Sequence, residues 1–465
     1  MRKLLTYMLL CFCFAGFSQN KQLIYGLQEV PQSLLVNPGG LAPEGTYVGI
    51  PLLSQFYLSA GTSGVTAYDI FGNHSTTINQ RITTAIMQLR NDDFFTVNQQ
   101  LELVSFGWRS QDDLYFSGGF YQELDMITYF PKDLARLAWE GNQSNLGYPF
   151  NFADLSTTGE ILTTLHFGVN KQVSDRLMLG ARAKLYNSML HFRSVNNSGT
   201  FRTELGDANS NNIYEHFFQN IDLQLQTSGY APLREDKSGV GGILGRSFFG
   251  GNFGVGFDLG ATYLINDLWT ISGSILDLGT VFHQKDVENY TIQGNYTFEG
   301  IEFLFPSLSN EDAIDYYQNL EDEFEDELPV DTTYAAYTQW RPTKVNFGLT
   351  YYINNDGAGD CDCRRRTRRG DVQSVGLQLF SIMRPKNPQY AATLFYYRKL
   401  SENFSGKIAY TIDAFSNSNI GLAVVADVGI FNLYLSADNL LSYSNLADAN
   451  LVSLQAGINL KFDPE

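Results

Sequence analysis

Apolar and polar residues alternate with a period of two along most of this chain. Between Phe253 and Ile265 every odd-numbered residue is apolar or aromatic, whereas the even-numbered residues from Gly254 to Thr262 are small or polar. The last segment, residues 452–462, alternates in the same way and ends on an aromatic residue. Successive side chains of a strand point to opposite faces, so each such segment predicts a β-strand with one apolar and one polar face.

Segments of this kind predict an all-β fold with about fourteen strands, within a range of about 12 to 16. They lie at residues 46–62, 95–109, 113–130, 157–172, 177–193, 250–265, 268–283, 342–354, 372–384, 389–400, 403–416, 418–428, 431–440 and 450–462. Short turns alternate with long connections at residues 63–94, 131–156, 194–249 and 284–341. A transmembrane barrel has short periplasmic turns and long outer loops, so this alternation predicts a transmembrane antiparallel β-barrel.

Two strand-like runs, residues 221–226 and 290–298, lie inside the long connections. Either they extend the barrel above the membrane or fold over its mouth, or they cross the bilayer and raise the strand count to about sixteen. A secreted soluble β protein would also alternate, but the Gly, Thr and Asn on the polar faces and the aromatic end of the last strand favour the barrel.

A turn-rich stretch precedes the first predicted strand. It contains Asn37, Pro38, Gly39, Gly40 and Leu41, and its Pro and Gly residues dictate the backbone angles of a compact loop. Because it lies on the periplasmic side of the first strand, we expect it to fill the lumen. The chain is therefore divided into a signal peptide at residues 1–18, an N-terminal hatch at residues 19–45 and the barrel at residues 46–465.

Composition and charge agree with export to the outer membrane of a Gram-negative bacterium. Residues 1–18 combine a basic start at Arg2 and Lys3 with an apolar core and small residues at the cleavage site. Aromatic residues make up 14% of the chain and charged residues only 17%. The net charge of -18 excludes a nucleic-acid partner, because binding to phosphate requires a basic surface.

The sequence offers no enzyme signature. None of the five His residues has metal-ligand spacing, and neither a G-x-S-x-G motif nor a phosphate-binding loop is present. The acidic segment at residues 311–331 matches no calcium loop. We therefore expect no catalytic residues, no cofactor and no metal site.

Charged residues on the polar faces of the predicted strands should point into the lumen. This lumen set comprises Glu123, Asp125, Arg182, Lys184, Asp258, Lys344, Lys407 and Asp413.

A second charged feature is the basic periplasmic loop at residues 355–371. It carries five closely spaced arginines, namely Arg364, Arg365, Arg366, Arg368 and Arg369. Two interpretations stay open for it, a solvated loop and a site that contacts a periplasmic or outer-membrane protein partner.

The hatch residues also carry a resemblance. The run from Asn37 to Ala42 resembles the hatch motif of the long-chain fatty-acid transporter family of outer-membrane barrels, whose members have fourteen strands; Gly39 replaces the usual Ala. Residues 37–61, the helix start at Phe130 and the late Arg384-Pro385 pair are similar to a Bacteroidota family of outer-membrane barrels without an established function. The resemblance covers nearly the whole mature chain and implies fold and location.

Two functions follow as hypotheses. The first is passive, porin-like uptake of a hydrophobic or small amphipathic compound through the outer membrane, with the hatch controlling passage. The second is a barrel subunit of a protein-assembly or secretion complex that grips its partners through the five arginines.

Overall fold

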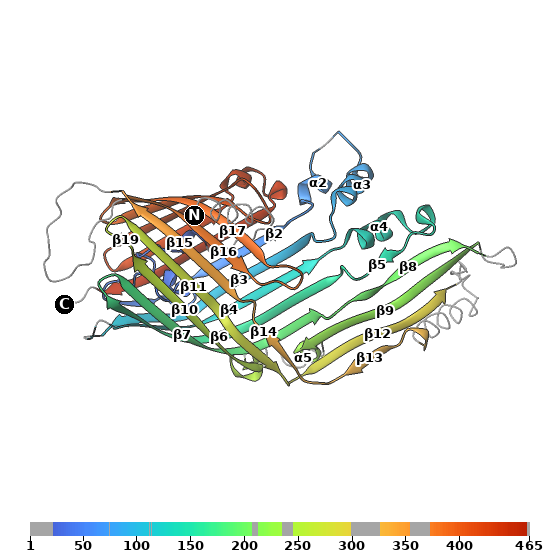
Figure 1. Ribbon diagram of the computed structural model, residues 1–465, viewed down its shortest axis with the longest axis horizontal. Helices are drawn as coiled ribbons and strands as arrows, with labels where there is room; N and C mark the ends of the chain where they lie inside the picture. Colours follow the sequence, from blue (N-terminus) through green and yellow to red (C-terminus); the bar gives the residue numbers. More distant parts are fainter. Residues whose placement is uncertain are drawn as a thin grey trace, which may run out of the picture.

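A computed structural model describes residues 22–73, 75–110, 112, 114–206, 213–234, 245–298, 326–353 and 373–462. Within these residues, fourteen antiparallel wall strands close into one barrel (Figure 1). The first wall strand consists of β1 and β2, and it pairs with the last strand, β21, on one side and with β3 on the other. The predicted fold class and strand count are confirmed, and each of the fourteen predicted ranges corresponds to one wall strand.

The wall strands follow one another in chain order around the barrel. Their bounds are β1 (Thr46–Gly49) with β2 (Phe56–Thr62), β3 (Phe94–Arg109), β4 (Leu114–Tyr129), β6 (Ser156–Ser174), β7 (Leu177–Ser194), β10 (Asn252–Leu264), β11 (Trp269–His283), β14 (Tyr337–Trp340) with β15 (Lys344–Tyr352), β16 (Gln373–Ile382), β17 (Gln389–Ser401), β18 (Phe404–Ile412), β19 (Asn419–Val428), β20 (Phe431–Asp438) and β21 (Leu451–Phe462).

The predicted alternation sorts side chains between the outside and the lumen. On β10, Phe257 and Leu259 are exposed on the outside, whereas Asp258 between them is fully buried. An apolar outer surface around a polar interior is the arrangement of an outer-membrane barrel, in which closure of the sheet pairs every strand edge. Of the helices that the structure describes, none is long and apolar enough to cross a membrane.

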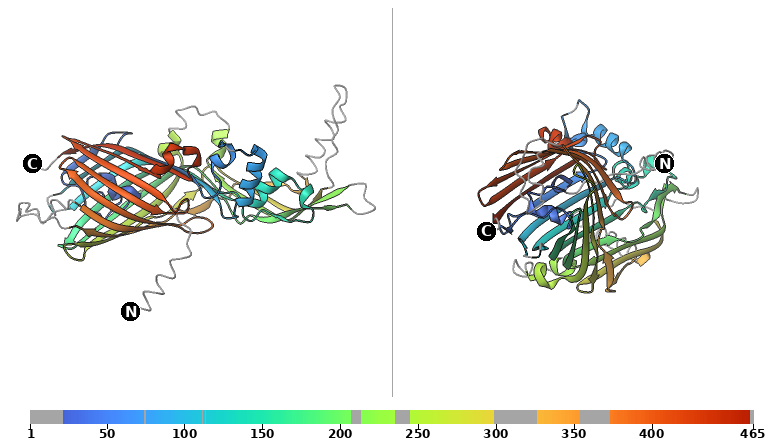
Figure 2. Two further views of the ribbon diagram at one scale, coloured as in Figure 1. Left: turned by 90° about the horizontal axis from the view of Figure 1, so that it is seen from above. Right: turned by 60° about the vertical axis from the view of Figure 1, so that its left-hand side comes forward.

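Five further strands extend the wall beyond the barrel at the end that carries the long connections. They are β5 (Phe150–Asn151), β8 (Ser198–Leu205), β9 (Tyr214–Ser228), β12 (Val287–Phe298) and β13 (Val330–Thr333). The extension begins where residues 191–194, at the end of β7, pair with β9. It continues from β9 to β12 and from β12 to β13. Figures 1 and 2 show it as a long sheet that projects past the barrel. The strand-like runs at residues 221–226 and 290–298 therefore extend the wall.

Short helices gather at the same end, which we call the outer end because outer loops are the long ones. They are α2 (Ala67–Phe71), α3 (Ile78–Gln88), α4 (Lys132–Glu140), α5 (Tyr230–Arg234), η3 (Gln143–Asn145), the π-helical turn η4 (Arg246–Gly250), η5 (Leu440–Ser444) and η6 (Leu446–Asp448). Thr66 and Thr77 begin α2 and α3 with capping boxes, in which each threonine hydroxyl accepts a hydrogen bond from the third helical residue. At the other end, residues 22–45 turn back into the lumen and include η1 (Gln22–Ile24) and η2 (Pro31–Leu35).

The first wall strand is interrupted, which corrects the prediction of one continuous strand at residues 46–62. Gly49 lies opposite Asn459, and Phe56 lies opposite Ala456. Seven residues of the first strand therefore span the same length as three residues of β21, and residues 50–55 form a loop in the wall. Pro51 lacks a backbone N–H, and Leu52 adopts a positive φ of 67°. We call residues 50–55 the wall break.

The fold makes a direct prediction about membrane insertion. Replacing Leu259, which is 50% exposed on the barrel wall, with Arg should lower the free energy of unfolding by about 2–4 kcal/mol, because a cation then faces hydrocarbon near mid-membrane. The control is Leu205→Arg in the extension, where the leucine is 66% exposed and the charge should meet water. Urea unfolding in lipid vesicles measures both, and equal losses would contradict the placement of the barrel in the bilayer.

Candidate functional site: a plug and an ionic bar in the lumen

Residues 22–45, which we call the plug, fill the lumen at the end opposite the long connections. Leu23, Ile24 and Leu27 are buried against the inner face of strands β18 to β20. Beside them the Lys407 ammonium donates to the carbonyl of Tyr25 at 2.8 Å and lies 4.4 Å from the centre of the Phe395 ring. The plug therefore combines apolar packing with a charged donor from the wall.

The predicted hatch residues form a compact knot within the plug. The Asn37 side-chain oxygen accepts a hydrogen bond of 3.0 Å from the Gly39 N–H, which closes a tight turn around Pro38. The Asn170 amide on β6 donates to the carbonyls of Pro38 and Gly40 at 2.7 and 2.8 Å. Leu41, the last residue of the predicted motif, is partly exposed.

Two wall glycines make room for the knot. Gly180 on β7 and Gly260 on β10 lie directly opposite each other in the sheet. A Cβ at Gly260 would overlap the Asn37 side chain, and a Cβ at Gly180 would overlap the Pro38 carbonyl. A Cβ at Gly39 would in turn overlap the Gly260 backbone. Backbone packs directly against backbone here, so these positions require glycine.

The plug is held mainly through its own main-chain carbonyls. Arg182 donates to the carbonyls of Leu34 and Leu35, and the Ser274 hydroxyl donates to the carbonyl of Val36 at 2.6 Å. A hydrogen bond contributes about 0.5–1.5 kcal/mol net, and one with a charged donor about 1.5–3 kcal/mol. The plug is thus fixed by several contacts of moderate strength.

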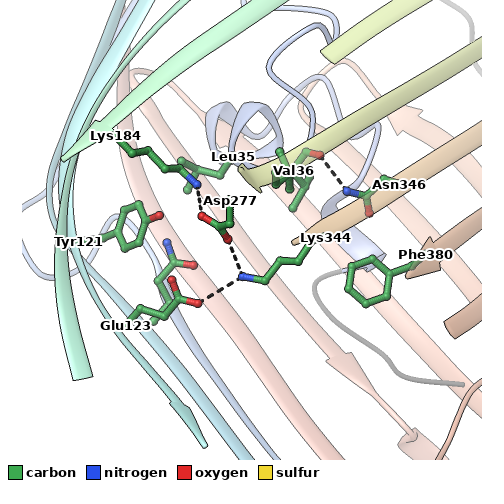
Figure 3. A pocket seen from close by; sticks show the side chains of 11 residues that line it. Leu35, Val36, Tyr121, Glu123, Lys184, Asp277, Lys344, Asn346 and Phe380 are labelled. Atoms are coloured by element: carbon green, nitrogen blue, oxygen red, sulfur yellow. Dashed lines mark hydrogen bonds and ion pairs between the residues drawn. The ribbon is translucent and has the colours of Figure 1, made fainter. Parts of the chain in front are cut away.

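Above the plug, on its outer side, a network of ion pairs crosses the lumen. Lys184 on β7 lies 2.9 Å from Asp258 and 2.6 Å from Asp277, where the bonded atoms are the ammonium nitrogen and a carboxylate oxygen. Lys344 on β15 reaches Asp277 at 2.9 Å and Glu123 on β4 at 3.3 Å. Figure 3 shows Lys344 between these two carboxylates.

Further pairs join the same walls of the barrel. Arg341, between β14 and β15, pairs with Glu160 on β6 and lies 3.4 Å from Glu123. Arg384, just after β16, pairs with Asp125 on β4 at 2.8 Å. β4 and β6 are the third and fourth wall strands, whereas β15 and β16 are the eighth and ninth. These contacts therefore span the lumen, and we call the whole network the ionic bar.

The ionic bar is balanced in charge. Its five cations are Arg182, Lys184, Arg341, Lys344 and Arg384, and its five anions are Glu123, Asp125, Glu160, Asp258 and Asp277. A balanced set of paired charges selects neither anions nor cations. A cavity of about 30 Å³ beside it, lined by Val36, Tyr121 and Asn346 among others, has room for roughly one water molecule.

An apolar cluster lies above the ionic bar, toward the outer end. Phe94, Ile127, Tyr129, Phe415 and Leu451 are buried together on the inner face, and we call them the mouth cluster. The Phe94 ring meets those of Phe415 and Tyr129 at centroid distances of 5.5 and 5.8 Å, in edge-on and tilted arrangements favourable for aromatic pairs.

The connection between β16 and β17, residues 383–388, reaches across to the mouth cluster. Its Lys386 ammonium lies 5.1 Å from the centre of the Tyr129 ring and 3.0 Å from a carboxylate oxygen of Asp154.

The structure places the predicted lumen residues in three different parts of the barrel. Six of them, Glu123, Asp125, Arg182, Lys184, Asp258 and Lys344, belong to the ionic bar. Lys407 contacts the plug instead. Asp413 is buried at an outer turn, where its carboxylate accepts the N–H groups of Phe415 and Ser416 at 2.9 and 2.8 Å.

Four residues of the ionic bar are missing from the predicted set. Asp277 lies at a bulge with φ of 58°, where the strict alternation that identified the others is broken. Arg341 and Arg384 each lie just outside a strand and directly before a proline. The two Arg-Pro pairs at strand ends were therefore the sequence signal that could have identified these residues. Glu160 obeys the alternation and was identifiable from it.

The five arginines of the basic loop lie outside the described residues, so their partner-binding role stays a prediction. The flanking strands end at the short-turn end, where Tyr352 lies opposite Ser374. In the part of the chain that the structure describes, no group of three or more His, Cys, Asp or Glu side chains is arranged to hold a metal ion.

The closed barrel, its apolar exterior and its internal plug define a plugged outer-membrane β-barrel of the Gram-negative type. The chain belongs to the "Family of unknown function (DUF5723)", whose family model matches residues 38–438. No curated protein matches the sequence.

Solved outer-membrane barrels with remote similarity include a deltaS2S3 mutant of the monoaromatic hydrocarbon channel TodX, at 10% identity, TM-score 0.44 and 96% coverage of each chain. A Pseudomonas aeruginosa FadL homologue is similar at 11% identity and TM-score 0.43, with 96% of this chain and 100% of that chain covered. The Ralstonia pickettii toluene transporter TbuX is similar at 12% identity and TM-score 0.41, with 97% of this chain and 95% of that chain covered.

The glycine contact predicts how the plug can be loosened. Gly260→Val should push the knot out of its place against β7 and β10, because the added side chain overlaps Asn37 and Gly39. Limited proteolysis should then cut the plug, while the barrel keeps its heat-modifiable gel mobility. Gly406→Val on β18 is the matched control, since the nearest atom to its Cβ would lie 3.6 Å away. Equal protection of the plug in both variants would refute the contact.

The ionic bar predicts a strong double-mutant coupling. Arg384→Ala alone should cost about 3–5 kcal/mol of unfolding free energy, because Asp125 is left buried and unpaired. Combining it with Asp125→Asn should restore most of that loss. The control Lys461→Gln breaks the more exposed pair with Asp427 and should cost at most about 1 kcal/mol. Additive effects of the Arg384 and Asp125 changes in urea unfolding would contradict the pairing.

Proposed function

We propose that this protein is a non-enzymatic outer-membrane barrel that takes up hydrophobic or small amphipathic compounds, with the plug controlling their passage. The compound is received at the mouth cluster and leaves the lumen sideways through the wall break. The observation that carries this proposal is that the plug residue Gln32 hydrogen-bonds to both strands beside the wall break.

The mouth cluster supports a hydrophobic cargo. Water-filled pores have polar interiors, whereas here five aromatic and aliphatic side chains pack together in the outer part of the lumen. An apolar compound gains roughly 25 cal/mol for each Å² of surface that it removes from water. The charge-balanced ionic bar and the plug lie beneath this cluster and obstruct the straight path to the periplasm.

The wall break supports a sideways exit. Leu52 and Leu53 are exposed on the outside of the barrel, while Ser54 and Gln55 are fully buried on its inside. The Ser54 hydroxyl and both polar atoms of the Gln55 side chain have no hydrogen-bond partner. Unpaired buried polar atoms cost about 1–3 kcal/mol each, so this part of the wall is poorly stabilised.

The plug residue Gln32 closes this part of the wall. Its side-chain nitrogen donates to the Glu102 carboxylate on β3 at 2.9 Å and to the Asn459 side-chain oxygen on β21 at 2.8 Å. Asn459 donates back to the Gln32 oxygen at 3.0 Å. Gln32 thus bridges the two strands that flank the first wall strand. Movement of the plug would break the hydrogen bonds to both strands at once.

Loosening the plug tests this function. Gln32→Ala should increase the influx of a hydrophobic fluorescent probe, N-phenyl-1-naphthylamine, into proteoliposomes, because β3 and β21 lose their bridge. Swelling in a hydrophilic sugar should stay at the parental rate. The matched control is Gln88→Ala on α3, where the glutamine is exposed at the outer end. An increase in sugar permeation alone, or unchanged probe influx, would overturn the proposal.

A further inference from the structure

Apolar side chains are exposed on the short helices beside the outer rim of the barrel. Phe71 at the end of α2 is 74% exposed, and Leu441 in η5 is 64% exposed. Tyr443 and Leu446, from η5 and η6, are also exposed. We call these four residues the rim patch.

The helices of the rim patch form one contiguous unit. η6 packs against α2, and η5 packs against β19. The Tyr443 hydroxyl donates to the Ser453 carbonyl on β21 at 2.9 Å, which ties η5 to the wall. The views in Figures 1 and 2 agree that these helices lie beside the wall at the outer end, away from the lumen. The rim patch is therefore held by backbone and side-chain contacts that leave its apolar groups uncovered.

The rim patch continues the lipid-facing surface of the barrel. Leu433 and Leu435 on β20 point outward and are exposed, and η5 begins two residues after β20 ends. A strand that rises about 3.3 Å per residue at a tilt near 45° ends about 7 Å above Leu435. The rim patch therefore begins only about 7 Å above the lipid-facing side chain of Leu435. Interfacial helices place their apolar groups at the boundary of headgroups and acyl chains.

We propose that the rim patch inserts into the outer leaflet of the membrane and contacts lipid acyl chains. The barrel then has a membrane contact beyond its strands, on the side of β19 to β21, while the extension rises from the side of β7. Because the contact involves neither the plug nor the wall break, it stands independently of the proposed transport.

Brominated lipids test this contact because they quench tryptophan only on contact with their acyl chains. The four tryptophans, Trp108, Trp139, Trp269 and Trp340, are first replaced by Phe. Single tryptophans are then introduced as Leu441→Trp and Phe71→Trp in full-length protein in nanodiscs. Leu435→Trp on the barrel wall is the quenched reference, and Leu205→Trp, equally apolar but in the extension, is the unquenched reference.

The proposal expects brominated lipid to quench Leu441→Trp and Phe71→Trp to nearly the same fraction as Leu435→Trp. Heat-modifiable gel mobility identifies folded variants, and either rim position suffices if the other does not fold. Fluorescence at both rim positions that matches Leu205→Trp would overturn the proposal and leave a protein as the occupant of the patch.

Discussion

The constraint behind this architecture is that every backbone N–H and C=O group facing hydrocarbon must find a partner within the protein. The wall strands meet this constraint by antiparallel pairing, with register shifts in several pairs, and β21 closes the ring against β1 and β2. The wall break interrupts this ladder. There the regular ladder is replaced by four backbone hydrogen bonds between neighbouring strands, donated by the N–H groups of Ile50, Leu52, Glu102 and Ile458.

The interior meets a second constraint, because charges removed from water must be paired. The ionic bar does so, and its Lys344–Glu123 and Arg384–Asp125 pairs join opposite walls across the lumen. Wall donors, among them the charged Lys407 and Arg182, bind main-chain carbonyls of the plug, and the Tyr397 hydroxyl donates to the plug's Glu29 carboxylate. The ionic bar joins wall strands to one another, whereas the plug is a separate segment held by hydrogen bonds and apolar packing. This difference makes the plug the moving part of the proposed mechanism.

Much of this could be predicted from the sequence because strand alternation is a local signal. The parity of Arg182, Lys184 and Asp258 placed them in the lumen, where the structure pairs them. Pairings across the lumen were beyond such reasoning, since Glu123 and Lys344 are far apart in sequence and meet only when the barrel closes. Bulges set a second limit, because the register shift at Asp277 reverses the parity that identifies lumen residues.

The wall break was also beyond the reach of strand alternation alone. Alternation continued through Ile50 and Leu52, so the segment had the pattern of an unbroken strand. Pro51 was the local warning, but the consequence depends on β21 and β3, which bridge the gap from both sides. Likewise, the Asn37–Gly40 turn was evident from its residues, whereas its need for Gly180 and Gly260 arises only from contact.

A reversible lock tests most directly whether the plug seals the wall break. Gln32→Cys with Asn459→Cys, in a background with Cys361 and Cys363 replaced by Ser, places a disulfide where the two side chains now share hydrogen bonds. Influx of the hydrophobic probe should fall to the level of protein-free vesicles when the pair is oxidised and return when it is reduced. Equal influx through the oxidised and reduced protein would contradict the account.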